Sequence, residues 1–312
     1  MLGAGAMGSL FGAALAGAGH EVRMLCRRAE QAQSITEQGL AIATSTSGLR
    51  VFRPAATTDP ARIGVVDAVL VCCKAYDTSA ASASLPPLVR PDTVVLTLQN
   101  GLGNVEALSE RVPPGQIVAG VTHQGAYVSG PGRVDHAGCG PTTIGELDGR
   151  DTGRVRALAA TLTDAGLPTE VSGNIHGLQW AKLLINAAIN PLTAVLSVTN
   201  GRLLELPDAP AIMRRAVAEG EAVARAAGVG LPCDADGIWA QVTEAARLTG
   251  ANRSSMLQDV LHGRRTEIDS INGVIVSEGR RLRIPTPVNE TLCNLVRCAD
   301  RALHPGCGGC RN

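Results

Sequence analysis

Short apolar runs alternate with segments of helical period over the first half of the chain. The runs at residues 20–26, 67–73 and 93–98 are largely apolar and include β-branched side chains. Uninterrupted apolar runs of this length are typical of parallel strands that are covered on both faces. Between residues 117 and 147, Gly and Pro separate shorter runs, which predicts antiparallel hairpins that complete the sheet.

Helical spacing of the apolar residues dominates after Pro168. The segments with this pattern are residues 180–196, 209–227, 237–248, 256–280 with an interruption, and 288–303. A chain of 312 residues has room for two cores. We therefore expect one domain over residues 1–170, an all-helical domain over 171–304, and a flexible tail over 305–312.

The composition excludes several classes of partner. Lys plus Arg equals Asp plus Glu at 28 each, so no net field attracts nucleic acid or an anionic membrane. Two Trp, two Tyr and two Phe leave little aromatic surface for stacking on bases. There is no run close to the ~20 apolar residues of a membrane span, and no signal sequence. We expect a cytoplasmic protein that acts on a small molecule.

The nine cysteines do not suggest a disulfide framework. Cys26, Cys72 and Cys73 lie in strand-like apolar runs, where they are expected to be buried, reduced thiols. Cys307 and Cys310 have the spacing of metal ligands, but no second pair or histidine cluster completes a tetrahedral site. We expect no metal site and interpret this end as a frayed tail.

A glycine-rich turn opens the first predicted helix. The motif Gly3-Ala4-Gly5-Ala6-Met7-Gly8 precedes a helix-like run over residues 9–19. In dinucleotide-binding folds the first glycine makes the turn, the second lets backbone approach the pyrophosphate, and the third lets helix and strand pack closely. The chain is therefore expected to be an α/β protein, with an N-terminal Rossmann-type dinucleotide-binding domain and a C-terminal all-helical domain.

Arg27 and Arg28 follow the next predicted strand, which ends at Cys26. An NAD enzyme carries an acidic residue at this place for the ribose hydroxyls, whereas guanidinium groups suit the 2′-phosphate of NADP. The alternative is a solvated basic corner without a ligand.

Two further polar residues stand at the carboxyl ends of predicted strands. Lys74 follows Cys73, and Asn100 follows the run that ends at Leu98 and Gln99. Ligands bind at that edge of open α/β sheets. Lys74 could hold a carboxylate or order the cofactor, or it could be a solvated loop lysine. Asn100, which precedes Gly101, could simply form a turn.

Lys182, Asn186 and Asn190 recur at four-residue intervals in an otherwise apolar helix pattern. They therefore share one face of that helix. Burial of an ammonium and two amides costs several kcal/mol unless partners compensate them. A ligand rich in oxygen atoms could be that partner, and so could neighbouring backbone groups.

Two segments of the helical half carry further polar candidates. Ser254 and Ser255 precede an apolar run, where either could cap a helix. Glu267 lies among apolar Ile268 and Ile271, so its carboxylate could be turned inward. A buried glutamate that meets a buried lysine would couple the two pKa values, which suits acid catalysis at a carbonyl.

Six motifs run in one order over nearly the whole chain. They are Gly3-Ala4-Gly5-Ala6-Met7-Gly8, Cys73-Lys74-Ala75-Tyr76-Asp77-Thr78, Leu98-Gln99-Asn100-Gly101, Trp180-Ala181-Lys182-Leu183 with Asn186 and Asn190, Ser254-Ser255-Met256-Leu257-Gln258-Asp259, and Thr266-Glu267-Ile268-Asp269-Ser270-Ile271-Asn272-Gly273. Together they closely resemble the 2-dehydropantoate 2-reductase (ketopantoate reductase) family. The resemblance implies reduction of 2-dehydropantoate to (R)-pantoate by NADPH, a step in pantothenate and coenzyme A synthesis.

The resemblance also implies roles for individual residues. Lys182 is expected to be the general acid, and Glu267 to orient that lysine and the substrate hydroxyl. The other residues implied to bind substrate are Asn186, Asn190, Ser254, Ser255, Lys74 and Asn100. The residues implied to bind the cofactor are Gly3, Gly5, Ala6, Met7, Gly8, Arg27, Lys74, Asn100 and Glu267.

Other functions stay open at this point. A paralogous reductase could take another 2-oxo acid, and a β-hydroxyacid dehydrogenase relative would share the catalytic lysine. A regulator that binds NADPH without turnover would share the fold. A homodimer is possible, but the pattern does not predict the oligomeric state.

The first strand of the expected nucleotide-binding domain is unusually short. Only Met1 and Leu2 precede Gly3, whereas this fold needs about five strand residues before its turn. We expect the natural product to be longer at its amino end, with weak stability or cofactor binding for the shorter chain.

Overall fold

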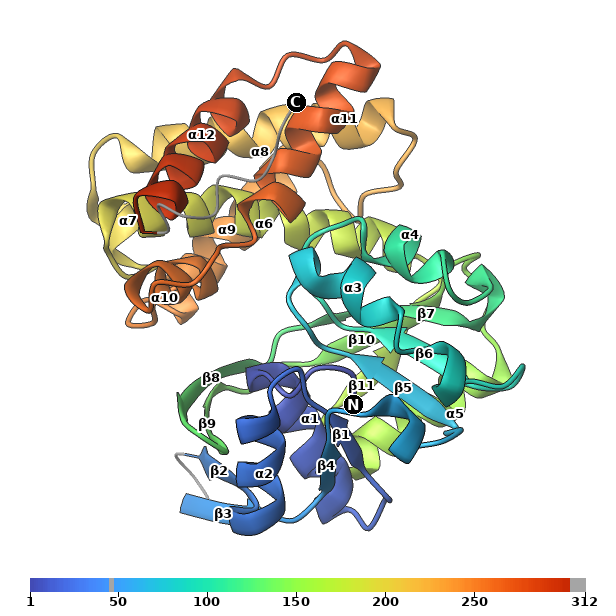
Figure 1. The fold of residues 1–312 in the computed structure, drawn as a ribbon. Coiled ribbons are helices and arrows are strands. Elements are labelled where there is room, and N and C mark those ends of the chain that lie inside the picture. Colours follow the sequence, from blue (N-terminus) through green and yellow to red (C-terminus); the bar gives the residue numbers. More distant parts are fainter. Residues whose placement is uncertain (45–47, 304–312) are drawn as a thin grey trace. The chain divides into compact units, whose positions relative to one another are not determined.

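The computed structural model describes residues 1–44 and 48–303, which form two compact units (Figure 1). The first unit contains Met1–Gln99 and Gly103–Ile175. The second contains Asn100–Leu102 and the chain from His176 onward. The expected fold class, an α/β Rossmann-type domain followed by a helical domain, is confirmed.

A mixed, mostly parallel sheet forms the centre of the first unit. The strands β5, β6 and β7 are parallel neighbours, β10 is antiparallel to β7, and β11 is parallel to β10. These strands also lie side by side in Figure 1. The predicted strands at 67–73 and 93–98 are thus confirmed, with slightly shorter bounds. The bounds are β5 (Ala68–Val71), β6 (Val94–Thr97), β7 (Ile117–Thr122), β10 (Thr142–Glu146) and β11 (Thr169–Val171).

The amino end joins a further pair of strands to this sheet. β1 (Arg23–Leu25) pairs in parallel with β4 (Ala55–Thr57). Leu2 forms parallel bridges to Leu25 on one side and to Val71 on the other, so it occupies the central position between β1 and β5. Four backbone hydrogen bonds hold Met1, Leu2 and Gly3 in this place. Three residues therefore supply the backbone pairing that connects the two parts of the sheet.

A second sheet has the strand order β3-β2-β9-β8. The expectation that hairpins complete a single sheet holds for β10 but is wrong for β8 and β9, because β9 pairs in parallel with β2. The first helix, α1 (Ala6–Gly17), is buried on two faces: Phe11 packs with the main sheet, whereas Leu10 packs with Ile42 and Val134 of the second sheet. A helix that is apolar on more than one side needs cover on more than one side. The bounds are β2 (Leu40–Thr44), β3 (Gly48–Phe52), β8 (Gly125–Gly130) and β9 (Arg133–Gly138).

The helices of the first unit are mostly short. They are α1 (Ala6–Gly17), α2 (Ala29–Gln38), α3 (Thr78–Ser82), α4 (Asn104–Ser109) and α5 (Gly153–Asp164), with 3-10 turns at η1 (Pro60–Arg62), η2 (Ala75–Asp77), η3 (Pro86–Leu88) and η4 (Pro114–Gln116).

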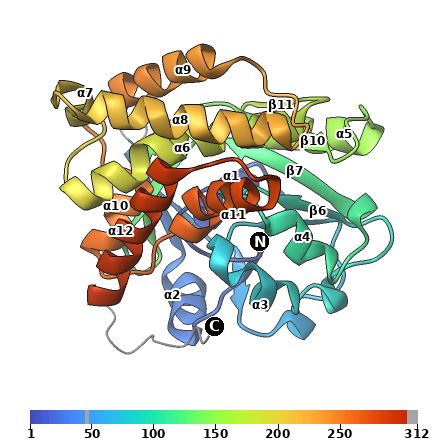
Figure 2. The ribbon, with the colours of Figure 1, turned by 90° about the horizontal axis from the view of Figure 1, so that it is seen from above.

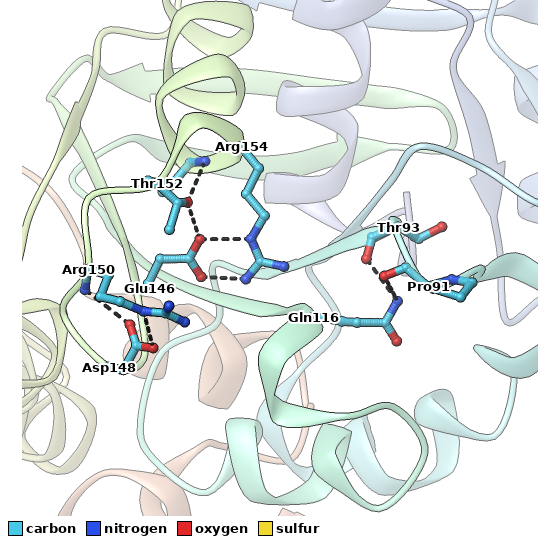
Figure 3. A network of polar contacts seen from close by, with 9 residues as sticks. Pro91, Thr93, Gln116, Glu146, Asp148, Arg150, Thr152 and Arg154 are labelled. Carbon is cyan, nitrogen blue, oxygen red and sulfur yellow. Dashed lines mark hydrogen bonds and ion pairs between the residues drawn. The ribbon is translucent and has the colours of Figure 1, made fainter.

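A polar cluster attaches α5 to the end of β10 (Figure 3). Arg154 and Thr152 both donate hydrogen bonds to the buried carboxylate of Glu146, and the Thr152 hydroxyl caps α5 by accepting from the Val155 N–H. Burial alone would raise the pKa of Glu146, but the hydrogen bonds from Arg154 and Thr152 outweigh it and lower that pKa. The cluster is thus a structural ion pair that stabilises the folded first unit.

The second unit consists of helices around one apolar core. All five helical segments expected after Pro168 are confirmed, with the interruption at 262–271. Helices α8, α11 and α12 lie side by side (Figure 2). Gly220 on α8 permits close packing, because a Cβ there would lie 2.3 Å from the Leu184 side chain of α6. The bounds are α6 (Ile175–Leu196), α7 (Arg202–Glu205), α8 (Ala209–Ala226), α9 (Ala235–Leu248), α10 (Ser255–Leu261), η5 (Ile268–Ser270), α11 (Asn272–Leu282) and α12 (Pro287–Leu303).

The cysteines of the described chain are free thiols. Cys26 is buried, as expected, whereas Cys72 and Cys73 are half-buried. Cys307 and Cys310 lie outside the described residues. Within the described part of the chain, no helix has the length and apolarity needed to span a membrane.

Candidate active site

The glycine turn lies against the end of β5, where close contacts explain two of its glycines. Gly3 has a φ of +100°, and a Cβ there would lie 2.8 Å from the Cys73 backbone nitrogen. A Cβ on Gly8 would lie 1.9 Å from the Gly3 carbonyl oxygen. Both positions therefore require glycine for the packing of the protein itself.

Gly5 is different, because a Cβ there would meet no protein atom within 4 Å. Gly5 is exposed, has an ordinary φ of −73° and is the N-cap of α1. The protein alone does not require glycine at this position. Glycine leaves the backbone open at the positive end of α1, where an anion such as a pyrophosphate is favoured. This observation fits the glycine motif to a dinucleotide.

Lys74 follows directly on the stretch that touches the glycine turn. The buried side chain of Gln99 fixes this region, because its amide donates to the Cys73 carbonyl at 2.9 Å and to the Thr78 hydroxyl at 2.6 Å. Thr97 in turn donates to the Gln99 amide oxygen at 3.0 Å. The ends of β5 and β6 are thereby joined at the carboxyl edge of the sheet, and Lys74 and Asn100 follow these two ends as the sequence predicted.

Arg27 lies at the same edge of the first unit. Its guanidinium pairs with the Asp77 carboxylate at 2.7 Å, although the Arg27 side chain is 76% exposed. An exposed pair of this kind contributes only about 0 to 1 kcal/mol, so an incoming phosphate can displace it. Arg28 is also exposed and precedes α2 as its N-cap residue.

In the second unit, α6 carries the predicted polar stripe. Lys182, Asn186 and Asn190 lie on this one helix at four-residue intervals, so they share a face. Asn190 is buried, whereas Lys182 and Asn186 are half-buried. Most neighbouring positions, including Leu183 and Ala187, belong to the apolar core. The stripe therefore forms a polar line along one side of an otherwise apolar helix.

Lys182 interacts electrostatically with Glu267, which is buried at the start of η5. Burial lowers the pKa of the Lys182 ammonium to about 8, and the nearby Glu267 carboxylate acts in the opposite direction. An ammonium with this pKa stays charged at neutral pH yet gives up its proton far more readily than an exposed lysine. This is the property that a general acid needs.

Gly101 and Leu102, which follow Asn100, pack against the segment that carries Glu267. A Cβ on Gly101, which has a φ of +79°, would lie 2.4 Å from the Ser270 carbonyl oxygen. The Leu102 N–H donates to that same oxygen at 3.0 Å. Asn100 therefore precedes a turn, which is one of the interpretations that the sequence allowed. Ser270, three residues after Glu267, holds this turn in place.

The two candidate serines have different environments. Ser254 is buried and caps α10 by accepting from the Leu257 N–H at 3.0 Å. Thr193 on α6 donates its only hydroxyl proton to the Asn190 carbonyl, so the 2.7 Å contact between the two hydroxyls takes its proton from Ser254. Ser255 is exposed at the first helical position. The cap interpretation thus applies to Ser254.

The candidate residues form two groups, one in each unit. The first unit brings together the glycine turn, Lys74 and Arg27. The second brings together Lys182, Glu267, Asn100 and the serine pair at the start of α10, along with Asn186 and Asn190. Among the described residues, no cluster of three metal-ligating side chains occurs.

A compositional signal strengthens two of these candidates. Lys74 and Lys182 are the only lysines in the 312 residues, and arginine supplies the other 26 of the 28 basic side chains. A guanidinium does not lose its proton in proteins, whereas an ammonium does so readily when it is buried. Lys182 is a half-buried lysine in a chain whose other cations are almost all arginine, and its pKa is lowered.

Sequence reasoning missed two supporting residues, Thr193 and Asn272. Asn272 is fully buried and donates to the Ala187 carbonyl of α6 at 3.1 Å. Pro191, which lies inside α6, was the available signal, because an internal proline leaves the carbonyl four residues earlier without its helical donor.

A Rossmann-type sheet with a ligand-ready glycine turn, together with a helical unit that carries an acid–base pair, defines a dinucleotide-dependent oxidoreductase. The chain matches two family models, Ketopantoate reductase PanE/ApbA over residues 1–149 and Ketopantoate reductase PanE/ApbA C terminal over residues 174–299. It belongs to the ketopantoate reductase family.

Relatives and solved structures agree with this membership. The chain is 40% identical to a 2-dehydropantoate 2-reductase of Halobacterium salinarum, covering 96% of this chain and 97% of the relative. A ketopantoate reductase of Ralstonia eutropha has 37% identity and a TM-score of 0.88, with 97% and 98% of the two chains covered. A D-mandelate dehydrogenase, solved with NADH and anilino(oxo)acetate, has 30% identity and a TM-score of 0.91, with 96% and 97% covered.

Proposed function

We propose that this protein reduces 2-dehydropantoate to (R)-pantoate with NADPH, as a 2-dehydropantoate 2-reductase of pantothenate biosynthesis. The observation that carries the proposal is the Lys182 ammonium, which has a lowered pKa, interacts with Glu267 and shares a helix face with two asparagine amides. Family membership and the names of the relatives support the same reaction.

The cofactor would supply a hydride to the ketone carbon of the substrate. Negative charge then develops on the ketone oxygen, and we assign Lys182 to stabilise it and to deliver its Nζ proton. A preorganised cation at such an oxygen is worth several kcal/mol in a site that excludes water. The carbonyl becomes a hydroxyl, and Lys182 is left neutral until it regains a proton from solvent.

The remaining polar residues would bind and orient. We assign Asn186 and Asn190 to the substrate hydroxyl, and Glu267 to the orientation of Lys182. Ser255 is the serine that we assign to the substrate carboxylate, because the Ser254 proton is already committed to Thr193. The glycine turn would hold the pyrophosphate, and Arg27 the 2′-phosphate of NADP.

Lys74 and Asn100 complete the assignment. We propose that each contacts the cofactor or the substrate. Lys74 would supply a second cation for an anionic group. Asn100 would supply an amide that is held in place by the Gly101 turn on Ser270.

A second candidate function is the reduction of another 2-oxo acid. The likeness to D-mandelate dehydrogenase favours it, since that protein was solved with NADH and anilino(oxo)acetate. A panel of 2-dehydropantoate, phenylglyoxylate and pyruvate, each with NADPH and NADH, separates the two. The proposed function requires the highest kcat/KM for 2-dehydropantoate with NADPH, and binding of NADPH without any turnover would indicate a regulator instead.

A further inference from the structure

Helix α6 has a gap in its hydrogen bonding between the two asparagines of the polar stripe. Pro191 lies in the helix interior, and its ring nitrogen carries no hydrogen. The carbonyl of Ala187, which lies four residues earlier, therefore loses the donor that a regular helix would provide. Ala187 is fully buried, so water does not replace that donor.

Asn272 fills this gap. Its side-chain Nδ2 donates to the Ala187 carbonyl at 3.1 Å and to the Oδ1 of Asn289 at 3.0 Å. Both neighbours are acceptors at these contacts, which fixes the amide with its nitrogen toward α6. Asn272 and Asn289 are both completely buried. Among the described residues the Oδ1 of Asn272 has no hydrogen-bond partner, so the hydrogen bonds of this amide come from its donor side.

The side chain of Asn289, which accepts the second hydrogen bond of Asn272, is itself held by several hydrogen bonds. The Nδ2 of Asn289 donates to the Ala216 carbonyl at 3.0 Å and to Glu219 at 2.9 Å. The Glu219 carboxylate also accepts the backbone N–H groups of Val288 and Asn289 at the start of α12. The amide of Asn272 thus connects α6 to a rigid junction of α8, α11 and α12.

We propose that Asn272 is a positioning residue, which closes the gap that Pro191 opens in α6 and fixes the turn between Asn186 and Asn190. Asn272 follows Glu267 by five residues, so the same contact also ties the segment of Glu267 to the helix of Lys182. On the other side of the proline, the hydroxyls of Thr193 and Ser254 hold α6 to α10. The catalytic part of this inference rests on the proposed function.

The test is a double-mutant cycle of Asn272→Leu and Pro191→Ala. Alanine at 191 restores the missing N–H, so the Ala187 carbonyl no longer depends on Asn272. With Pro191 present, we expect Asn272→Leu to lower kcat for 2-dehydropantoate about tenfold and to lower the melting temperature, while KM for NADPH changes less than about twofold. With alanine at 191, we expect the same substitution to lower kcat by about threefold or less.

Asn294→Leu is the matched control, because Asn294 is an exposed asparagine of α12. It should change neither kcat nor the melting temperature. Asn272→Ala, which removes the donor without adding a charge or bulk, is the gentler variant if Asn272→Leu does not fold. Rescue of either variant by Pro191→Ala supports the proposal. Equal losses in both backgrounds, including a failure of both to fold, overturn it.

The melting temperatures separate this inference from the proposed function. If the wild-type protein does not reduce 2-dehydropantoate, the proposed function fails, but the thermal cycle still reports whether Asn272 replaces the missing proline donor.

Discussion

Lys182 on α6 and Glu267 before η5 form a pair of opposite charges inside the helical unit. Burial lowers the pKa of Lys182 to about 8, and the Glu267 carboxylate prevents a larger decrease. The balance of these two effects keeps the ammonium charged at neutral pH and ready to donate. The predictions on catalysis follow from this balance.

Lys182→Ala should lower kcat by a factor of about 10² to 10⁴, because it removes the proton donor of the transition state. Affinity for NADPH should stay nearly unchanged. Steady-state kinetics with 2-dehydropantoate and a separate titration of NADPH measure the two quantities. Lys182→Arg is a useful companion, since it keeps the positive charge but holds its proton too tightly for acid catalysis. Wild-type turnover in either variant contradicts the assigned role.

The activity should fall on the alkaline side with a midpoint near pH 8, because a general acid works only while it is protonated and the pKa of Lys182 is about 8. Glu267→Gln removes the charge that raises this pKa, so the alkaline limb should move to lower pH. Profiles of kcat against pH for both proteins check the direction. If the alkaline limb of the Glu267→Gln profile moves to higher pH or does not move, Glu267 does not set the protonation of Lys182.

The scarcity of lysine allows the same pKa to be measured directly. Reductive methylation with ¹³C-formaldehyde labels Lys74, Lys182 and the amino terminus, since no other lysine is present. An NMR titration should show one lysine signal with a midpoint near pH 8, and Lys182→Arg should remove that signal. Persistence of the signal in this variant would assign the lowered pKa to another amine.

Arg27→Ala should weaken NADPH binding by about 1.5 to 3 kcal/mol, the value of a charge-assisted hydrogen bond, and should hardly affect NADH. Asp77→Asn should strengthen NADPH binding, because it frees Arg27 from the ion pair at 2.7 Å. The expected gain is small, at most about 1 kcal/mol for an exposed pair. Fluorescence titrations of both cofactors measure these changes, and equal losses for NADH and NADPH would mean that Arg27 does not contact the 2′-phosphate.

Glu146→Gln should lower the stability of the protein at neutral pH by about 1 to 3 kcal/mol, because it weakens the bonds from Arg154 and Thr152. The pKa of Glu146 is lowered in the folded protein, so its contribution is present above the usual carboxyl range and is lost as the pH falls through the folded pKa. Urea unfolding measures the free energy of unfolding of the variant and the wild type. The difference between the two should be smaller at acidic pH than at neutral pH. A constant difference would mean that the carboxylate charge has no part in it.

The sequence by itself determined the local features of the site. Four-residue spacing on one helix is enough to align Lys182 with Asn186 and Asn190, since helical geometry depends only on neighbouring residues. The glycine turn is local for the same reason, and so is the change from strand pattern to helical pattern near Pro168. The apolar runs at 67–73 and 93–98 likewise became strands, because burial on both faces leaves a mark on each strand separately.

Only the tertiary structure decided which distant residues meet. The partner of Lys182, the tie between Thr193 and Ser254, and the donor that Asn272 gives to Ala187 all join segments more than sixty residues apart. The pairing of β9 with β2 in a second sheet is of the same kind. Hydrophobic periodicity tells each segment which face to bury but not against which partner, because many apolar faces are equivalent until packing and hydrogen-bond satisfaction select one arrangement.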